Sequence, residues 1–263
     1  MSNLEALILG VIQGLTEFLP ISSSGHLELG SYFLKVNSSN NLLFAIIVHG
    51  ATALSTIAVF RKEILSLTKD LFQFKWNEGT EYVSKLVLSM IPVGIVGVLF
   101  ESEIESFFGG KIIFVASMLL VTGLILLSTR LIKPQNNSIS YFNAFIIGLA
   151  QAVAILPGIS RSGATIATSL LLGVDKEKAT RFSFLMVLAP ILGALMLKVM
   201  DLAEDPSLAG DIGVSSLIIG FIAAFISGLA ACSWMIQIVK KGKLSYFAIY
   251  CFVVAFIVYL LLL

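Results

Sequence analysis

The sequence predicts an all-α polytopic membrane protein with an inverted-topology repeat, in which each half is a re-entrant helix hairpin followed by three transmembrane helices. The first observation is composition: 57% of the 263 residues are hydrophobic and 13% are charged, about half the charged share of a soluble domain. The second is that the apolar runs are long and do not alternate, which favours membrane helices over a barrel. The formal net charge of +1 offers no basic surface for nucleic acid.

The third observation is a polar motif that occurs twice. The pattern G-x-x-Q, then L-P, then I-S-x-S-G spans residues 10–25 and again residues 148–163. Between Gln and Pro the second copy is one residue shorter, and Gly158 restores the register before the serines. Glycine, proline and hydroxyl residues in the same order predict an internal repeat, with halves at 1–133 and 134–263.

Each half begins with a segment that is too short to cross a membrane. Residues 4–19 would make about 24 Å of helix, short of a crossing of about 30 Å, and Pro20 then stops the helix. An apolar stretch returns to Leu34, so we expect a re-entrant hairpin over 4–34 and its counterpart over 144–172. Full spans are expected at about 42–60, 86–100, 112–129, 182–199, 212–239 and 244–263.

The charged segments predict the orientation of these spans. Basic residues favour a cytoplasmic location for 61–85, 130–143, 174–181 and 240–243, and acidic residues favour the outside for 101–111 and 200–211. Both termini are then outside, the first hairpin enters from outside, and the second enters from the cytoplasm. In transporters with inverted repeats, such broken helices meet at the midplane and form the binding site.

The first motif carries a carboxylate and an imidazole. Gln13 and Glu17 are four residues apart and share one helical face. A carboxylate inside a membrane is costly unless it is paired, protonated or hydrated, so Glu17 indicates a site, although it could instead brace the turn at Pro20. His26 follows Ser23 by three residues, where it could take the hydroxyl proton or act as a nucleophile; otherwise it is a polar core residue. For His49, site and packing roles are equally open.

The second motif carries Arg161, a fixed cation whose guanidinium geometry suits phosphate. Both motifs open helices, and two helix N-termini facing one another make an anion pocket for phosphate or diphosphate. Arg161 could also pair with Glu17 as structural support. This role is compatible with phosphate binding, because the ion pair would form while the site is empty. The hydroxyls and glycines expected to bind phosphate are Ser22, Ser24, Gly25, Ser160, Ser162, Gly163 and Thr165.

These motifs closely resemble those of the bacterial undecaprenyl-diphosphatases linked to bacitracin resistance. Residues 13–27 resemble that family's (E/Q)xxxE and SSSGH region, and residues 157–165 resemble its PGxSRSxxT motif. Segments 182–184 and 247–250 also fit, and the resemblance covers essentially the whole chain. One departure is Cys251, where the family often has arginine.

The resemblance implies an enzyme of the bacterial cytoplasmic membrane with its site facing the periplasm. It would hydrolyse undecaprenyl diphosphate to undecaprenyl phosphate, the recycled lipid carrier for cell-wall sugars, with a divalent cation, Mg²⁺ or Ca²⁺. We hypothesise that Ser23 attacks the terminal phosphorus, that His26 takes its proton with help from Glu17, and that Arg161 holds the diphosphate. Gln13 and Glu17 are alternatively cation ligands. Direct attack by His26 is the main variant.

Other functions compete with this hypothesis. Lipid phosphatases of the phosphatidic-acid type need a second histidine after the Ser-Arg pair, and no histidine follows Arg161 here. A lipid-carrier flippase or secondary transporter remains an alternative, because inverted repeats are typical of transporters. The Gly10 and Gly14 pair could pack against a partner chain in a homodimer, although packing within the chain is favoured.

Overall fold

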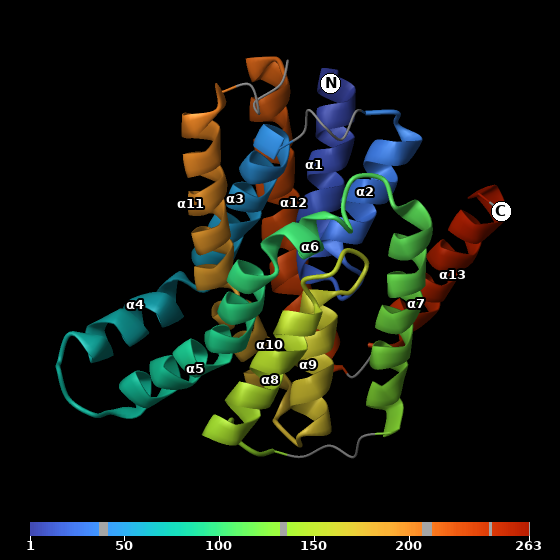
Figure 1. The fold of residues 1–263 in the computed structure, drawn as a ribbon. Coiled ribbons are helices and arrows are strands. Elements are labelled where there is room, and N and C mark those ends of the chain that lie inside the picture. The colour runs from blue at the N-terminus through green and yellow to red at the C-terminus, as the bar shows by residue number, and fades with distance from the viewer. Residues whose placement is uncertain (37–41, 132–135, 207–211, 242–243, 263) are drawn as a thin grey trace.

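The structure, a computed structural model, describes residues 1–36, 42–131, 136–206, 212–241 and 244–262, and these are almost entirely helical (Figure 1). The first half contains α1 (Asn3–Phe18), α2 (Ser23–Phe33), α3 (Leu42–Val59), α4 (Arg61–Leu71), α5 (Glu78–Leu99), α6 (Glu101–Glu105) and α7 (Ile112–Ser128). The short helix η2 (Thr129–Leu131) ends the first half. The second half contains α8 (Tyr141–Val153), α9 (Arg161–Leu171), α10 (Lys176–Met186), α11 (Leu188–Glu204), α12 (Val214–Lys240) and α13 (Ser245–Leu262).

The helix lengths confirm a multi-pass membrane protein. Among the described residues, five helical stretches are long and apolar enough to cross a membrane, namely α5, α7, α10 with α11, α12 and α13. A sixth is reached if α3 and α4 are counted as one bent span, so the six predicted spans match the upper count. The predicted boundary at 133/134 lies outside the described residues, as do Lys133, Asp211 and Lys243 of the charged segments.

The predicted polar loop at 61–85 is wrong, because most of this segment is helical and only residues 72–77 connect its two helices. The chain bends by 76° after α3 and continues as α4, whose charged residues alternate with leucines and isoleucine at helical spacing, leaving none of its residues buried. Helix α5 then begins at Glu78, eight residues earlier than predicted, because the Asn77 side chain caps it by accepting a hydrogen bond from Thr80 N at 2.8 Å. The charged residues of 61–85 therefore lie on α4 and α5, except Lys75 in the connection between them.

The predicted loop at 174–181 is also helical. Asp175 starts α10 by accepting hydrogen bonds from the backbone N–H groups of Glu177 and Lys178, at 2.9 and 3.1 Å. Only Val187 separates α10 from α11, so the predicted span at 182–199 is the middle of a longer helical stretch. The hydrophobic periodicity of the sequence did not reveal the start of α10, because the first turn of this helix is charged.

Glycines allow the first helix of each motif to pack closely on a transmembrane helix. A Cβ added at Gly10 would lie 2.5 Å from the carbonyl oxygen of Gly220 on α12, and Gly14 also packs against α12, at Ala224 and Gly228. Gly148 of α8 packs in the same way on Ser89 of α5. The Gly10 and Gly14 face is therefore used within the chain, as expected, and gives no support for a homodimer through that motif.

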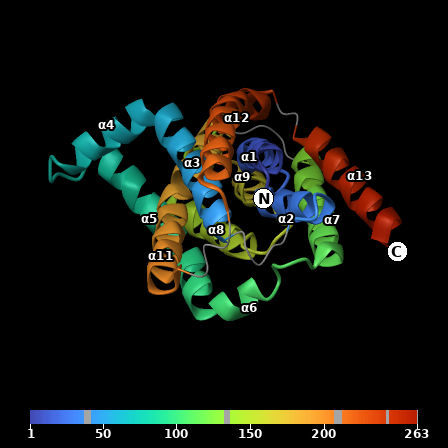
Figure 2. The same cartoon turned by 90° about the horizontal axis from the view of Figure 1, so that it is seen from above.

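The two helix pairs that contain the motifs approach one another from opposite ends of the bundle. Figure 1 shows α1 and α2 in its upper half and α8 and α9 in its lower half, with the connecting turns near mid-height. Seen from above, α1 and α9 lie at the centre and the remaining helices surround them (Figure 2). The fold therefore brings the two polar motifs together inside an apolar bundle.

Candidate active site

The turns of the two motifs are in direct contact. The Ser22 hydroxyl accepts a hydrogen bond from the backbone N–H of Gly158 at 3.1 Å, and the Ser162 hydroxyl donates to the carbonyl of Leu19 at 3.3 Å. Gly25 lies so close that a Cβ there would be 3.0 Å from the Cα of Gly158. Small residues at both turns therefore permit a contact that larger side chains would prevent.

The first turn holds a strained serine. Ser22 has φ 72° and ψ 99°, in a region that non-glycine residues rarely adopt, and it is buried. Its hydroxyl also caps α2 by accepting from Gly25 N at 3.2 Å. One oxygen thus joins a helix cap to the opposite turn, and these bonds offset a backbone strain of about 1–3 kcal/mol.

The second turn is braced by a threonine that the sequence analysis did not identify. Thr122, on α7, donates to the carbonyl of Gly158 at 2.8 Å and accepts from the N–H of Ser160 at 3.0 Å. The Ser160 hydroxyl in turn caps α9 by accepting from Gly163 N at 3.1 Å. Gly158 has φ 99°, which favours glycine. These contacts fix the start of α9 and hence the position of Arg161.

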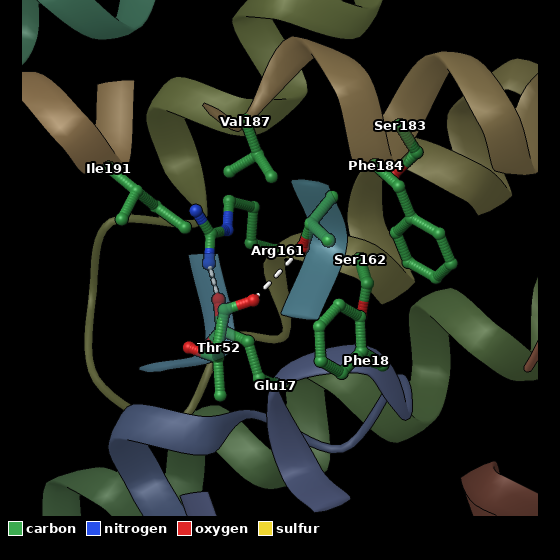
Figure 3. A pocket seen from close by; sticks show the side chains of 10 residues that line it. Glu17, Phe18, Thr52, Arg161, Ser162, Ser183, Phe184, Val187 and Ile191 are labelled. Atoms are coloured by element: carbon green, nitrogen blue, oxygen red, sulfur yellow. Dashed lines mark hydrogen bonds and ion pairs between the residues drawn. The ribbon is translucent and has the colours of Figure 1, made fainter. Parts of the chain in front are cut away.

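Glu17 is the centre of the polar cluster. Its carboxylate accepts hydrogen bonds from Ser23 Oγ at 2.6 Å and from Gln13 Nε2 at 3.0 Å, and it forms an ion pair with Arg161. The Arg161–Glu17 pair is drawn in Figure 3. Only 4% of the Glu17 side chain is exposed, against 26% for Arg161. The arrangement satisfies a buried carboxylate and presents the cation toward the more open side.

His26 does not contact the Ser23 hydroxyl. Its Nδ1 lies 2.8 Å from the Ser22 carbonyl oxygen, and its Nε2 lies 2.9 Å from the Tyr250 hydroxyl. The predicted transfer of the Ser23 proton to His26 therefore has no support in this geometry, since the hydroxyl points to Glu17 instead. Tyr250 was not singled out from the sequence, although it ends the 247–250 segment that fits the family.

Most of the hydroxyls predicted to bind phosphate make hydrogen bonds that hold the turns together. Ser22, Ser160 and Ser162 are buried in the contacts described above, and Thr165 hydrogen bonds Ser183 and the Arg161 carbonyl. Gly25 and Gly163 are buried within the helix starts. Ser24 is half-buried and lies 3.4 Å from the Ser22 hydroxyl, so it shares the more open side with Ser23.

Two residues of α3 complete the surroundings. Gln13 Nε2 lies 3.5 Å from the hydroxyl of Thr52, a contact that no local sequence pattern indicates. His49, one turn earlier, directs its Nδ1 to the Ala45 carbonyl at 2.9 Å within its own helix. The structure thus adds Thr52 to the cluster and gives His49 a local hydrogen bond.

A narrow pocket opens beside the ion pair. Its walls are polar near the cluster and apolar beyond it, and Figure 3 shows Val187 and Ile191 on one side of Arg161 and Thr52 and Glu17 on the other. The space left between these side chains is close to that of a single water molecule. A ligand as large as a diphosphate would enter this pocket only if the side chains around Arg161 moved apart.

The cluster fits a divalent cation only when further oxygen ligands are supplied. The buried Gln13 Oε1 has no hydrogen-bond partner, and with the Glu17 carboxylate it offers the hard oxygen donors that Mg²⁺ and Ca²⁺ prefer. Across the described ranges there is no group of three or more His, Cys, Asp or Glu side chains able to hold a metal. The remaining ligands would have to be diphosphate oxygens or water.

Known proteins match the chain over nearly its whole length. The family model for the bacitracin resistance protein BacA matches residues 6–257. An undecaprenyl-diphosphatase of Christiangramia forsetii is 55% identical over 97% of this chain and 96% of its own, and one of Bacteroides fragilis is 55% identical over the same shares. An undecaprenyl-diphosphatase of Methanobrevibacter smithii is 39% identical over 99% and 98%. The chain belongs to the BacA family of bacitracin resistance proteins.

Proposed function

We propose that this chain, an undecaprenyl-diphosphatase of the bacterial membrane, hydrolyses undecaprenyl diphosphate at the contact between its two turns. The products are undecaprenyl phosphate and inorganic phosphate. The observation that supports this site most strongly is the direct contact of Glu17 with both Ser23 and Arg161, which is 144 positions away in sequence. A carboxylate, a hydroxyl and a guanidinium converge there inside an apolar bundle.

Arg161 binds the diphosphate by exchanging partners. Its ion pair with Glu17 satisfies both charges while the pocket is narrow. A diphosphate brings more negative charge and several acceptor oxygens in the geometry that a guanidinium matches, so it competes for Arg161. The N-termini of α2 and α9, which start at the two turns, add their positive dipole ends. Binding thereby frees the Glu17 carboxylate from its cation.

Ser23 is the nucleophile in this proposal, and Glu17 is its base. Ser23 Oγ forms a bond to the terminal phosphorus while the anhydride P–O bond breaks, and undecaprenyl phosphate leaves with the bonding electrons. The hydroxyl proton passes to Glu17 across the 2.6 Å hydrogen bond. Water then attacks the phosphorus of phosphoserine, the P–Oγ bond breaks, Ser23 Oγ takes back the proton from Glu17, and inorganic phosphate leaves. The alternative in which His26 attacks is less well supported, because both of its ring nitrogens are engaged elsewhere.

In the alternative to this base role, Gln13 and Glu17 are the residues that would hold a divalent cation. When bound, Mg²⁺ or Ca²⁺ would neutralise charge on the diphosphate oxygens. The unpartnered Gln13 Oε1 supports this assignment, since a buried amide oxygen costs free energy unless a donor or a cation satisfies it.

We also propose that the chain is an inverted-topology repeat with its site open to the outer face of the cytoplasmic membrane. The opposite approach of the α1–α2 and α8–α9 pairs supports the inversion (Figure 1). The basic and acidic segments support the orientation. The prenyl tail would remain in lipid beside the apolar walls of the pocket, including Val187 and Ile191.

The test is phosphate release from undecaprenyl diphosphate by purified protein in detergent. Arg161→Ala should lower turnover by roughly 10²–10³-fold, because it removes a preorganised cation from the charge that develops in the transition state. Arg181→Ala, which removes a half-exposed arginine paired with Glu177 and Glu63, is the matched control and should retain activity. A chelator in a parallel sample tests the cation.

Three outcomes would change the proposal. An equal loss of turnover in Arg161→Ala and Arg181→Ala would contradict a specific role for Arg161 in the site. Full activity with the chelator present would remove Gln13 and Glu17 from cation binding and leave the hydrolase in place. Absence of phosphate release by well-folded wild-type protein would contradict the hydrolase, and lipid translocation would then be the next assay.

A further inference from the structure

We propose that Tyr250 is a positioning residue that fixes the orientation and hydrogen bonding of the His26 imidazole. The inference rests on the proposed function, in which the first turn, where His26 follows Ser23 by three residues, carries the nucleophile. It starts from a contact between residues 224 positions apart: the Tyr250 hydroxyl on α13 lies 2.9 Å from His26 Nε2 at the start of α2. In addition, the two rings stack, with centroids 5.5 Å apart and planes inclined by 16°.

The hydrogen bonds determine which nitrogen of His26 carries the proton. The partner of Nδ1 is the carbonyl oxygen of Ser22 at 2.8 Å, and a carbonyl can only accept, so Nδ1 must be protonated. In neutral His26 the lone pair is therefore on Nε2, where it accepts a hydrogen bond from the Tyr250 hydroxyl. A second proton would enter at Nε2.

Tyrosine suits this position because its hydroxyl both donates and accepts. When Nε2 is unprotonated the hydroxyl donates to it, and when Nε2 gains a proton the hydroxyl rotates and accepts. Tyr250 thus remains bonded to His26 in both protonation states, whereas the ring stacking holds the plane of the imidazole. Phenylalanine would keep the stacking and lose only the bond.

His26 and Tyr250 are less enclosed than the carboxylate of the polar cluster. His26 is half-buried, and Tyr250 is 42% exposed, whereas the nearby Glu17 side chain is almost completely enclosed. The opposite face of α13 is anchored, since Ala248, Cys251 and Ala255 are buried. The fold therefore presents Tyr250 from a fixed helix, and His26 is the more exposed of the two titratable groups that touch the first turn.

Steady-state kinetics test whether the contact between Tyr250 and His26 affects turnover. Tyr250→Phe should lower kcat roughly tenfold with little change in KM, because one hydrogen bond is lost and the substrate contacts remain. Two matched controls lie on the same helix. Tyr246→Phe alters an exposed tyrosine one turn away, and Tyr259→Phe removes a different interhelical bond, the 2.7 Å contact with Ser117 on α7. Both should keep kcat within twofold of the wild type.

A double-mutant cycle separates positioning of His26 from a general effect on α13. If Tyr250 acts through His26, the double variant His26→Ala with Tyr250→Phe should be no slower than His26→Ala alone. Multiplied losses in the double variant would overturn the inference. So would a loss in Tyr259→Phe equal to that in Tyr250→Phe.

Nitrogen NMR tests the geometry without turnover. The chain has two histidines, so ¹⁵N-histidine labelling gives two ring systems, and a His49→Gln sample identifies the His26 signals. Wild-type His26 should show a protonated Nδ1 and an unprotonated, hydrogen-bonded Nε2. Tyr250→Phe should move the Nε2 signal toward that of a free lone pair and leave Nδ1 protonated. An unchanged Nε2 signal would overturn the inference even if the protein were an active diphosphatase, and the expected shift would uphold the contact even if it were not.

Discussion

The two turns at the centre of the molecule have similar scaffolds and different chemistry. Ser22 and Ser160 occupy the same motif position, and each caps the helix that follows by accepting from a glycine N–H three residues on. The next motif position is Ser23 in the first turn and Arg161 in the second. One copy therefore contributes the proposed nucleophile and the other contributes the cation, at equivalent points of the two turns.

The helices that lead into the turns differ in the same way. Gln13 donates to Glu17, but the corresponding Gln151 is buried and neither its oxygen nor its nitrogen has a partner in the described structure. The position that corresponds to Glu17 is Ile155. Two turns with the same motif can therefore keep their caps and glycines for shape while their polar side chains serve the one site proposed above.

The largest expected effect separates neighbouring serines of the first turn. Ser23→Ala should lower phosphate release by about 10³-fold or more, because it removes the proposed nucleophile. Ser24→Ala should cost less than tenfold, since that hydroxyl only approaches Ser22 at 3.4 Å. Near-normal turnover by Ser23→Ala would move the nucleophile to His26 or to water.

The next effect concerns the shape of the second turn. Gly158→Ala should lower the free energy of unfolding by about 3 kcal/mol, because φ is 99° and the new Cβ would lie 2.5 Å from the Val115 carbonyl oxygen. Gly109→Ala is the control, with φ 82° but open space around it, and should cost about 1 kcal/mol. Apparent unfolding temperatures in detergent measure both. Equal shifts would mean that the contact with α7 contributes nothing.

A smaller effect is expected at the brace from α7. Thr122→Val leaves the buried Gly158 carbonyl and Ser160 N–H without their partner and should cost about 1–3 kcal/mol. Turnover should fall as well, because the Thr122 hydrogen bonds hold the residues just before Arg161 and so fix the position of Arg161. Thr129→Val is the control, since its hydroxyl bonds only Leu126 of the preceding turn. Full stability of Thr122→Val would show that the second turn holds its shape without α7.

The smallest effect should come from the unpartnered glutamine. Gln151→Leu should leave phosphate release unchanged and should raise the free energy of unfolding by up to about 1 kcal/mol, because an apolar side chain of similar size avoids burying an unsatisfied amide. Gln13→Leu, measured alongside, should lower turnover by about tenfold through the lost bond to Glu17. Loss of activity in Gln151→Leu would show that the second copy has its own polar role.

Sequence reasoning reached the membrane fold and the members of the cluster, because long apolar runs and a repeated polar motif are local signals. It located Glu17 and Arg161 and raised their pairing as one of two readings. Sequence reasoning failed for side-chain contacts that depend on packing between distant helices. No local pattern shows that Thr122 braces Gly158, that Tyr250 reaches His26, or that Ser23 points to Glu17. It also mistook charged helix starts for loops, because the charges of α4 and α10 hid their helical period.

The Ser22 hydroxyl, which bonds both its own helix cap and the opposite turn, has a consequence for biosynthesis. The chain emerges from the N-terminus, so α1 and α2 are made more than a hundred residues before the second turn. Until Gly158 arrives, Ser22 lacks the bond that helps to hold its unfavourable backbone, and Glu17 lacks its cation. The newly inserted N-terminal part therefore carries Glu17 and Ser23 of the proposed site without Arg161. In this proposal, activity begins only when the later helices have entered the membrane.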